Sequence, residues 1–284
     1  MDWLDRMNTV LNYIEDHLSD TIDYDQMAKI SLCSGSFFQR MFSNFTGLPL
    51  SEYIRRRRLS QAGMDLANGD TQVIDVAFRY GYDSPDAFTY AFKRLHGITP
   101  SQAKVKGAIL SNYPRLAFTI KIKGEAKMNY RLVEKSDFKV IGKSLQTTQE
   151  ENMKQQSIPK FWDQCKHDGT VAALCAIDKD KPLLGVCYDD ASDGSFRYMI
   201  GIEANTNAKD LEILTIPQAT WAVFESIGPM PFAIQKVWGE IFQDFLPTSK
   251  YEHAPMADFE LYPTDDNQSS EYQCEVWIPV ISKR

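Results

Sequence analysis

The sequence lacks the features that would place it in a membrane, on a secretory route or among disordered proteins. No run approaches the roughly 18 apolar residues that a membrane-spanning helix needs, and the N-terminus is acidic, whereas a secretory signal starts basic and continues apolar. No long polar or single-residue tract is present, and hydrophobic residues make up 43% of the chain, as in folded proteins. We therefore expect a cytoplasmic protein, and its 284 residues suffice for two domains.

The sequence is also poor in motifs that carry chemistry. It contains no nucleophile motif, no metal-ligand spacing and no phosphate-binding loop, so we expect no cofactor, no metal site, no catalytic residue and no enzymatic activity. The cysteines are odd in number, far apart and mostly set among apolar neighbours, which favours reduced core thiols over disulfides. They are Cys33, Cys165, Cys175, Cys187 and Cys274.

The net charge of −7 looks unfavourable for DNA binding until it is divided along the chain. Residues 1–127 hold 16 Lys and Arg against 14 Asp and Glu, whereas residues 128–284 hold 15 against 24. Five of the acidic residues in the first part precede Thr21. The stretch from Thr21 to Lys127 is therefore basic and suited to face phosphates.

The N-terminal part is patterned as short helices. Apolar residues from Trp3 to Leu18 recur at steps of three and four, which predicts an opening amphipathic helix. Asp23 and Gln26 form a capping box for a helix over 24–31. After a tight turn, a second helix begins at a Ser34 cap and ends at Gly47. Two short helices joined by a tight turn predict a helix-turn-helix motif.

This motif occurs twice, fifty positions apart. A long helix over 51–68 separates the copies and ends at Gly69; its length of roughly 27 Å would place two recognition helices in successive major-groove segments about 34 Å apart. One chain would then read two sub-sites on one face of the DNA. The matched sets are Ser34, Phe38, Phe42, Gly47 and Ser51 in the first copy and Ser84, Phe88, Phe92, Gly97 and Ser101 in the second.

The second copy resembles the signature of the AraC/XylS family of transcription regulators. The resemblance rests on Ile74–Ser84 (IDVAFRYGYDS), Phe88–Arg94 (FTYAFKR) and Gly97–Pro100 (GITP). It implies an all-α double helix-turn-helix domain over 1–106 that binds double-stranded DNA, with RNA polymerase as a further partner. Residues 101–103 depart from the family pattern at the end of the last helix, away from the reading surface.

A recognition helix turns its apolar face to the core and its polar face to the base edges. Gln39 suits adenine, Arg40 suits guanine or phosphate, Phe37 suits a thymine methyl, and Lys93 suits phosphate. For any one residue a merely solvated position is nearly as good an interpretation, whereas the repeat favours DNA contact for the set. The predicted set is Ser36, Phe37, Gln39, Arg40, Asp86, Thr89, Tyr90 and Lys93.

The densest basic run, Arg55–Arg58, points in four directions around a helix. We expect solvated, ion-paired surface there, with one or two side chains within reach of phosphate. After it, residues 107–127 lose helical periodicity and carry Gly and Pro, which predicts a linker, and the alternation over 116–122 predicts a strand within it.

The second half predicts an α+β domain over 128–284, built from two strand-helix-strand-strand units with both helices on one face and a groove near their junction. The first unit has strands near 138–142, 183–188 and 196–202 and a helix near 160–167. The second has strands near 219–226, 258–262 and 272–280 and a helix near 232–245.

This layout resembles the GyrI-like effector-binding domain. The resemblance rests on Pro159–Trp162 (PKFW), Phe259–Pro263 (FELYP) and Glu275–Val280 (EVWIPV). It implies a small-molecule effector domain that holds an aromatic or cationic ligand against a buried acid among aromatic rings.

The acid that the resemblance indicates is Glu275, which interrupts an otherwise apolar predicted strand. If the domain supplies no Lys or Arg to Glu275, a cationic ligand would be its partner; an exposed position on the sheet face is the equal alternative. The aromatic candidates for the walls are Trp162, Tyr188, Tyr198, Trp221, Trp238 and Tyr262. For each of these taken alone, core packing is the more common role.

These patterns together predict a sequence-specific DNA-binding transcription regulator, monomer or homodimer, that senses a small molecule. Two other functions compete with it. One is a GyrI-like hydrolase of strained small molecules, in which Glu275 acts with Tyr198 or Trp162; the other is a drug-sequestering protein. An attached DNA-reading module favours the regulator, because it gives ligand binding a purpose that turnover lacks.

Overall fold

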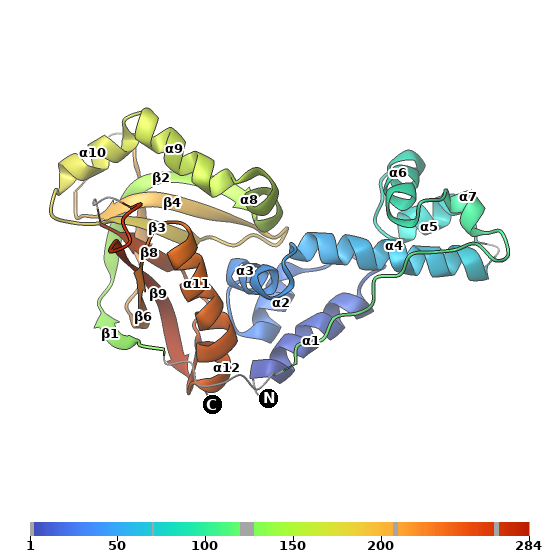
Figure 1. Cartoon of the computed structure of the whole chain (residues 1–284), viewed down its shortest axis with the longest axis horizontal. Helices are drawn as coiled ribbons and strands as arrows, with labels where there is room; N and C mark the ends of the chain where they lie inside the picture. The colour runs from blue at the N-terminus through green and yellow to red at the C-terminus, as the bar shows by residue number, and fades with distance from the viewer. Residues whose placement is uncertain (1–2, 70, 120–127, 207–209, 264–266, 284) are drawn as a thin grey trace. The chain divides into compact units, whose positions relative to one another are not determined.

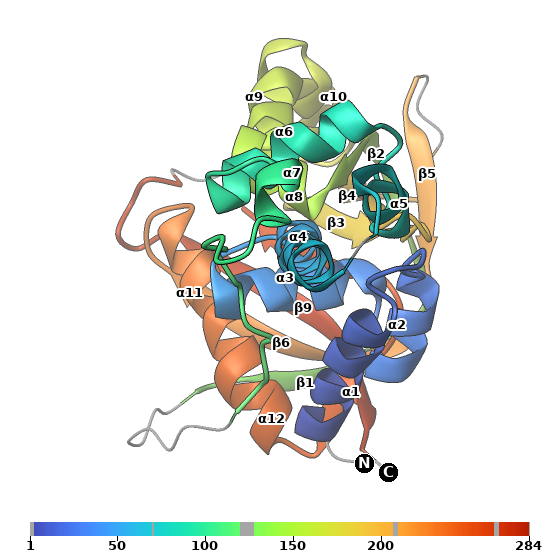
Figure 2. The same ribbon diagram turned by 90° about the vertical axis from the view of Figure 1, so that its right-hand side faces the viewer.

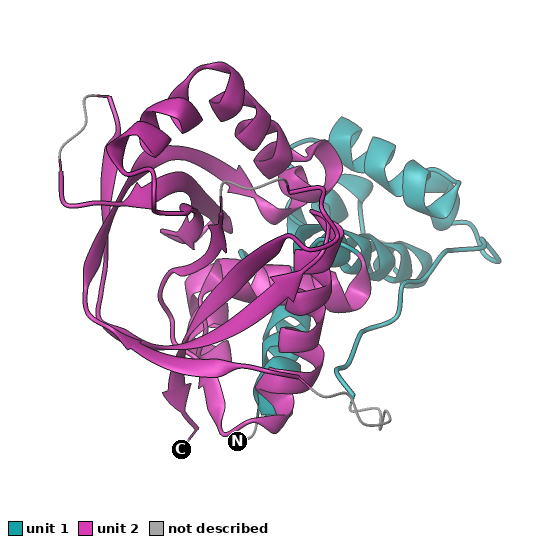
Figure 3. Cartoon of the chain, turned by 60° about the vertical axis from the view of Figure 1, so that its left-hand side comes forward, with its two compact units in different colours: residues 1–23, 48–120 teal, residues 24–47, 121–284 magenta. Residues whose placement is uncertain are grey.

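The computed structural model describes residues 3–69, 71–119, 128–206, 210–263 and 267–283 (Figure 1). The chain divides into two compact units, shown in Figure 3: unit 1 comprises residues 1–23 and 48–120, and unit 2 comprises residues 24–47 and 121–284. The two helices of the first helix-turn-helix motif thus belong to the same compact unit as the C-terminal sheet. The domain boundaries 1–106, 107–127 and 128–284 stay a prediction.

Unit 1 is helical, as its sequence pattern predicts. It contains α1 (Trp3–Asp16), α4 (Leu50–Asn68), α5 (Val73–Arg79), α6 (Pro85–His96) and α7 (Pro100–Ala103). The second helix-turn-helix motif, α5–α6, has the predicted Ser84 cap, whose side chain accepts a hydrogen bond from the amide of Ala87, and ends at Gly97 in the left-handed region. Phe88 and Phe92 are fully buried in its core.

The arginine run of α4 is bound into the helical framework more than the sequence predicts. The guanidinium of Arg57 lies 2.7 Å from the carboxylate of Glu15 on α1, and both side chains are less than one-tenth exposed. Arg58 donates to the carbonyls of Leu18 and Asp20, whereas Arg55 and Arg56 pair with Glu52. Ion pairing is confirmed, but Arg57 is buried and not solvated.

The described part of the predicted linker, residues 107–119, forms no strand; residues 120–122 of the expected strand lie outside the described residues. Side chains of unit 1 satisfy its backbone instead. The amide of Tyr113 donates to the hydroxyl of Ser60, and the amide of Phe118 donates to Asn8. These bonds attach the segment to the helices of unit 1. Because these amides already donate to side chains, they are not available to a neighbouring strand.

Unit 2 begins with α2 (Tyr24–Ser31) and α3 (Gly35–Thr46), the first helix-turn-helix motif. The Ser34 side chain caps α3 by accepting from the amide of Phe37, and Gly47 ends it in the left-handed region, so the two predicted caps are confirmed.

The rest of unit 2 is a large antiparallel sheet with helices. Among the described residues, nine strands pair in the order β1-β6-β9-β8-β3-β4-β2-β5, with β7 added at β9. The strands are β1 (Arg131–Lys135), β2 (Phe138–Thr148), β3 (Leu183–Tyr188), β4 (Ser195–Glu203), β5 (Glu212–Ile216), β6 (Ala219–Ile227), β7 (Tyr251–His253), β8 (Asp258–Tyr262) and β9 (Gln273–Ser282). The helices are α8 (Gln149–Gln155), α9 (Ser157–His167), α10 (Thr170–Ile177), α11 (Phe232–Glu240), the π-helical η1 (Ile241–Phe245) and α12 (Leu246–Thr248).

The predicted double strand-helix-strand-strand layout is confirmed. The first unit runs β2, α9, β3, β4, and the second runs β6, α11, β8, β9. The sequence analysis missed the short helices α8 and α10 and the strands β1, β5 and β7, which lie beside the predicted elements and are shorter than most of them. The two-domain class, with an all-α part and an α+β part, follows the prediction.

The strand register shows which side chains share each face of the sheet, because antiparallel partners project to the same side. Val186 pairs with Phe259 on one face, where the buried core consists of strand residues and Met256 and Ala257 of the β7–β8 connection pack against it. Cys187 pairs with Asp258 on the other face, where α9 and α10 pack through Phe161 and Leu174.

Helix α11 lies on that second face as well. Trp238 of α11 donates to Glu260 on β8. Only Phe259 lies between Asp258 and Glu260 on this strand, so both carboxylates project to the same side of the sheet. Both main helices therefore lie on one face, as predicted, and the strands β8, β3 and β4 run between them.

No described helix combines the length and the apolar composition that crossing a membrane requires. All five cysteines are thiols, and four of them are buried, in agreement with the prediction of reduced core thiols.

The buried pair of Glu15 and Arg57 gives a test of unit 1. Burial raises the pKa of Glu15, but hydrogen bonds from Arg57 and Tyr53 outweigh this and hold its pKa below the usual value. Glu15→Gln leaves a buried guanidinium without its counter-charge, so we expect the free energy of unfolding in urea to fall by about 3 kcal/mol.

The matched control is Arg79→Gln, which removes the exposed pair of Arg79 with Asp65 and should cost less than about 1 kcal/mol. Equal losses in the two variants would show that the Glu15 pair does not support the fold in the way described.

Candidate effector site and DNA-reading helices

The second recognition helix, α6, presents the predicted reading residues to solvent. Asp86 and Lys93 are exposed, Thr89 is half-buried, and Tyr90 is 71% exposed. The opposite side of the helix is buried through Phe88 and Phe92. The face that the sequence assigns to DNA is thus available in unit 1; contact with DNA itself stays a prediction.

The first recognition helix, α3, differs from the prediction. Ser36 and Gln39 are 5% exposed and Phe37 is 1% exposed, so the expected solvent exposure is wrong for these three. These three residues do lie, as the helical period predicts, away from the face through which Phe38 and Phe42 pack inside the motif. That face is covered because it packs against the sheet domain within unit 2.

Polar contacts hold α3 on the turn that joins β3 and β4. The side-chain amide of Gln39 donates to the carbonyl of Gly194 over 2.9 Å, and the backbone amide of Ser36 donates to Asp190 over 3.0 Å. Gly194 has a positive φ of 84°, and a Cβ there would lie 2.7 Å from the ring of Tyr24 on α2.

Aromatic contacts hold the first turn of α3 on α11, η1 and β7. The ring of Phe37 stacks on the imidazole of His253 at a centroid distance of 3.7 Å and meets Phe242 edge-on at 5.2 Å. It also meets Trp238 edge-on at 6.3 Å. In Figures 1 and 2, α3 lies beside α11, in agreement with these contacts.

Glu260 is the acid at the centre of the helix-covered face. One carboxylate oxygen accepts from the indole N–H of Trp238 over 2.7 Å, and the other accepts from the hydroxyl of Tyr262, also over 2.7 Å. Burial raises the pKa of Glu260 above its usual value, although these two hydrogen bonds and the charge of Arg40 act in the opposite direction. A buried carboxylate of this kind favours a cation beside it.

Aromatic residues surround this acid. The indole of Trp162 donates to the hydroxyl of Tyr198 over 3.0 Å and meets the ring of Tyr262 edge-on at 5.3 Å. Gly185 makes room for Tyr198, since a Cβ on Gly185 would lie 2.1 Å from the Tyr198 hydroxyl oxygen. Burial raises the pKa of Tyr198 and of Tyr262 well above the usual value, so both remain neutral hydrogen-bonding groups.

A second buried carboxylate, Asp258, lies two residues before Glu260. The guanidinium of Arg40 lies 2.6 Å from it, and the two side chains are 20% and 2% exposed, respectively. Burial alone raises the pKa of Asp258, but the charge of Arg40 outweighs that effect, so the pKa is lowered and the carboxylate stays ionised. His253 lies 3.7 Å from the same carboxylate, and burial lowers its pKa.

Glu275 does not belong to this site. Its neighbour Val276 pairs with Glu260, so Glu275 projects from the opposite face of the sheet. There it lies 2.7 Å from the guanidinium of Arg131 and accepts from the indole of Trp277 over 2.8 Å. The domain therefore supplies the cation whose absence was the condition for a ligand role, and the sheet-face alternative fits Glu275.

The six predicted aromatic residues separate in the same way. The structure brings four of them together around Glu260: Trp162, Tyr198, Trp238 and Tyr262. Trp221 is fully buried in the core of the opposite face, where it packs on Phe259, so the expectation of a ligand wall is wrong for it. Tyr188 packs against the core of that same opposite face and is hydrogen-bonded to Ser144, so it does not join the four rings around Glu260.

The sequence contains a signal for Glu260 in the alternation of its strand. Asp258, Glu260 and Tyr262 alternate with Phe259 and Leu261 along β8, and a strand with a polar or aromatic residue at every second position presents one face suited to a ligand. In β9, Gln273, Glu275 and Trp277 alternate with apolar residues in the same way, so this signal marks both strands as candidates.

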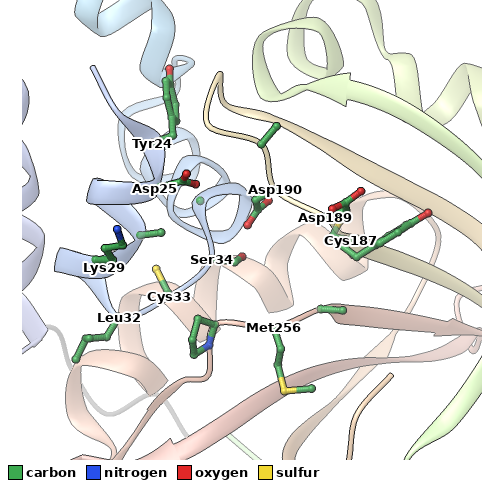
Figure 4. Close-up of a pocket in the computed structure, with 16 residues that line it drawn as sticks. Tyr24, Asp25, Lys29, Leu32, Cys33, Ser34, Cys187, Asp189, Asp190 and Met256 are labelled. Carbon is green, nitrogen blue, oxygen red and sulfur yellow. The ribbon is translucent and has the colours of Figure 1, made fainter. Parts of the chain in front are cut away.

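A pocket of about 490 Å³ lies in unit 2 beside Cys187 and Tyr188 at the end of β3 (Figure 4). Helices α2 and α3 line one side, including Tyr24, Lys29 and Ser34; the end of β3 and residues 255–257 line the other. Cys187 borders this pocket and also accepts a hydrogen bond from Arg40 over 3.3 Å.

Family models match both parts of the chain. The model described as a GyrI-like small-molecule binding domain matches residues 128–281, and a helix-turn-helix domain model matches residues 27–105.

Curated relatives are similar to the N-terminal part. The HTH-type transcriptional activator AarP of Providencia stuartii is 39% identical over 95 residues, which are 34% of this chain and 70% of AarP. The regulatory protein SoxS of Salmonella typhimurium is 36% identical over 95 residues and is covered to 89%. The chain covers only 30% of the transcriptional regulator YbfP of Bacillus subtilis, at 36% identity.

Among solved structures, SAV2435 bound to tetraphenylphosphonium matches with a TM-score of 0.50 and 26% identity, over 54% of this chain and 94% of SAV2435. Both resemblances that the motifs indicate are thereby confirmed. The chain belongs to the GyrI-like small-molecule binding family through residues 128–281 and to the AraC-type helix-turn-helix transcription regulators through its N-terminal part.

Proposed function

We propose that this DNA-binding regulator senses an aromatic cation, which it holds against Glu260 and the ring of Trp238. The observation that carries the proposal is the buried carboxylate of Glu260, hydrogen-bonded by two aromatic side chains and flanked by two more aromatic rings. Ring faces and a carboxylate together select delocalised cations, because the rings attract positive charge and cover apolar surface. A neutral ligand would leave the carboxylate uncompensated.

The similarity to SAV2435 supports the same class of ligand. That protein is described as bound to tetraphenylphosphonium, a cation whose charge is shielded by four phenyl groups. Such a cation cannot donate a hydrogen bond, so it suits a carboxylate whose oxygens already accept from Trp238 and Tyr262.

On the DNA side, the proposal assigns base and phosphate contacts to α6 through Asp86, Thr89, Tyr90 and Lys93, and to α3 through the corresponding residues of the first motif when they are exposed. The regulator would act in the cytoplasm, as monomer or homodimer, and pass its signal to RNA polymerase. The name of AarP as a transcriptional activator supports action at a promoter.

Binding, and not turnover, is the role that we assign to the acid site. Both oxygens of Glu260 are engaged by fixed donors of the domain, whereas a general acid or base needs an oxygen that reaches the reacting proton. A hydrolase remains the second candidate, and consumption of a bound ligand would reveal it.

Substitution of the acid tests the ligand site. Glu260→Gln keeps the shape and removes the charge, so we expect the affinity for tetraphenylphosphonium in isothermal titration calorimetry to fall about tenfold or more. Binding of the neutral triphenylphosphine oxide should change little. The matched control is Glu275→Gln, on the opposite face, which should leave both affinities unchanged; the reverse pattern would return the ligand role to Glu275.

The pH dependence follows from the raised pKa of Glu260. Affinity for tetraphenylphosphonium should fall by about one order of magnitude per pH unit as the pH drops below that raised pKa and the carboxylate takes up a proton. The loss should begin at a higher pH than for an ordinary glutamate and be much smaller in Glu260→Gln. Asp258 has a lowered pKa and Cys187 a raised one, so neither changes charge between neutral pH and the ordinary pKa of a glutamate. Burial lowers the pKa of His253, and any loss that its protonation causes persists in Glu260→Gln, which separates the two groups. An equal loss in wild type and Glu260→Gln would contradict the assignment.

Lys93 tests the DNA-reading surface in gel shifts on DNA from upstream of the protein's own gene. Lys93→Ala should weaken binding by about fivefold and lower the salt dependence by about one ion, as expected for one phosphate contact. The control is Lys236→Ala, an 80% exposed lysine on α11, which should leave the shift unchanged. Equal DNA affinities of the wild type and Lys93→Ala would show that Lys93 is not part of the DNA-reading surface.

A further inference from the structure

The proposed effector site already contains a cation that belongs to the chain. The guanidinium of Arg40 lies 4.1 Å from the centroid of the Trp238 ring and 2.6 Å from the carboxylate of Asp258. Its charge also acts on Glu260 and Cys187. Arg40 thus makes the two contacts expected of an aromatic cation, one with a ring face and one with a buried acid.

We name the helix-covered face of the sheet around Asp258, Glu260 and Trp238 the effector groove. We infer that Arg40 and the helix α3 that carries it are an internal occupant of this groove, and that a cationic effector and α3 compete for it. The inference rests on the proposed function, because it takes the acid site to be the effector site. Its consequence is regulatory: while α3 lies in the groove, the first recognition helix is withheld from DNA, and a bound cation releases it.

The competition is steric as well as electrostatic. Helix α3 contacts elements on both sides of the strands that carry the acids, α8 on one side and η1 on the other. Phe37 stacks on His253 and meets Trp238 edge-on, Phe242 stacks on Trp238, and Arg40 lies over the Trp238 ring. A ligand that used the ring face under Arg40 would have to displace the Arg40 side chain, and one with several rings would also meet Phe37 beside it.

The contact also hides the residues that the sequence assigns to base reading. Ser36, Phe37 and Gln39 are buried by the same surface that Arg40 neutralises. One helix face therefore has two mutually exclusive partners, the acidic groove and the negatively charged DNA. Linkage then requires that DNA, like the effector, favours the undocked helix, so each should increase the affinity for the other.

The charge of the docked helix explains why the groove stays folded without an effector. Asp258 is 2% exposed, and an isolated buried carboxylate is strongly unfavourable. Arg40 offsets that charge in the docked state, and an effector would offset it in the released state. The buried acid therefore has a compensating cation in both states, Arg40 when α3 is docked and the effector when α3 is released.

The test compares tetraphenylphosphonium affinity of full-length wild type, Arg40→Gln and Arg40→Lys by calorimetry. Removing the internal cation should tighten binding by roughly tenfold in Arg40→Gln, since the competent state is then more populated. Arg40→Lys keeps the charge and should tighten it far less. The matched control is Arg131→Gln, whose arginine pairs with Glu275 outside the groove and should not change the affinity.

Gln39→Ala is a second variant that leaves every charge of the groove in place. It removes only the hydrogen bond to Gly194, so it should loosen docking and tighten binding by about threefold. Thermal melts would reveal a folding defect in Arg40→Gln. If that variant does not fold, Gln39→Ala still tests the inference.

Hydrogen exchange on the wild-type protein measures release directly. Saturating tetraphenylphosphonium should increase the amide exchange of residues 35–46 while lowering that of β8. Unchanged affinity in Arg40→Gln and Gln39→Ala, or greater protection of residues 35–46 with the cation bound, would overturn the inference. If either of these results is obtained while Glu260→Gln still weakens binding, the effector site stands and the competition with α3 is refuted. If the wild-type protein binds no tetraphenylphosphonium, the proposed function itself has failed.

Discussion

The carboxylates of Asp258 and Glu260 project from one strand onto the face of the sheet that α9 and α11 cover, and their burial needs positive charge nearby. Trp238 and Tyr262 stabilise Glu260 by donating to both of its oxygens. Neither donor is charged, so the negative charge of the groove is met by Arg40. Under the proposed function, a cationic effector would be selected for the same reason that these acids bind Arg40.

This arrangement gives the first helix-turn-helix motif two roles. Its capping residues and its internal aromatic core are those of a DNA-reading helix pair, repeated in the second motif. Its polar face carries the groups that DNA requires, a guanidinium and a side-chain amide, and these groups equally suit an acidic protein surface. The second motif carries Asp86 and Lys93 at its exposed positions, and it remains exposed within its own unit.

The secondary structure was largely readable from the sequence, because it follows from local rules. Ser34 and Ser84 cap the recognition helices as predicted, Gly47 and Gly97 end them, and the alternating strands of the sheet appear close to their expected bounds. The misses were elements without strong periodicity, such as β5 and the helices beside α9. The alternation over 116–122 predicted a strand, but in the described part of that stretch the amides of Leu116 and Phe118 donate to side chains of Tyr53 and Asn8.

The sequence by itself determined the family, the two reading helices and the aromatic composition of the effector domain, since each depends on residue types at fixed spacing. Tertiary structure alone decided which acid lies among those rings. A shift of one residue turns a strand side chain to the other face, so the pairing of Val276 with Glu260 placed Glu275 beside Arg131 and Glu260 in the groove. It also decided that Arg40 meets Asp258, 218 positions further along the chain, because no local pattern records a contact made through the packing of a helix on a distant sheet.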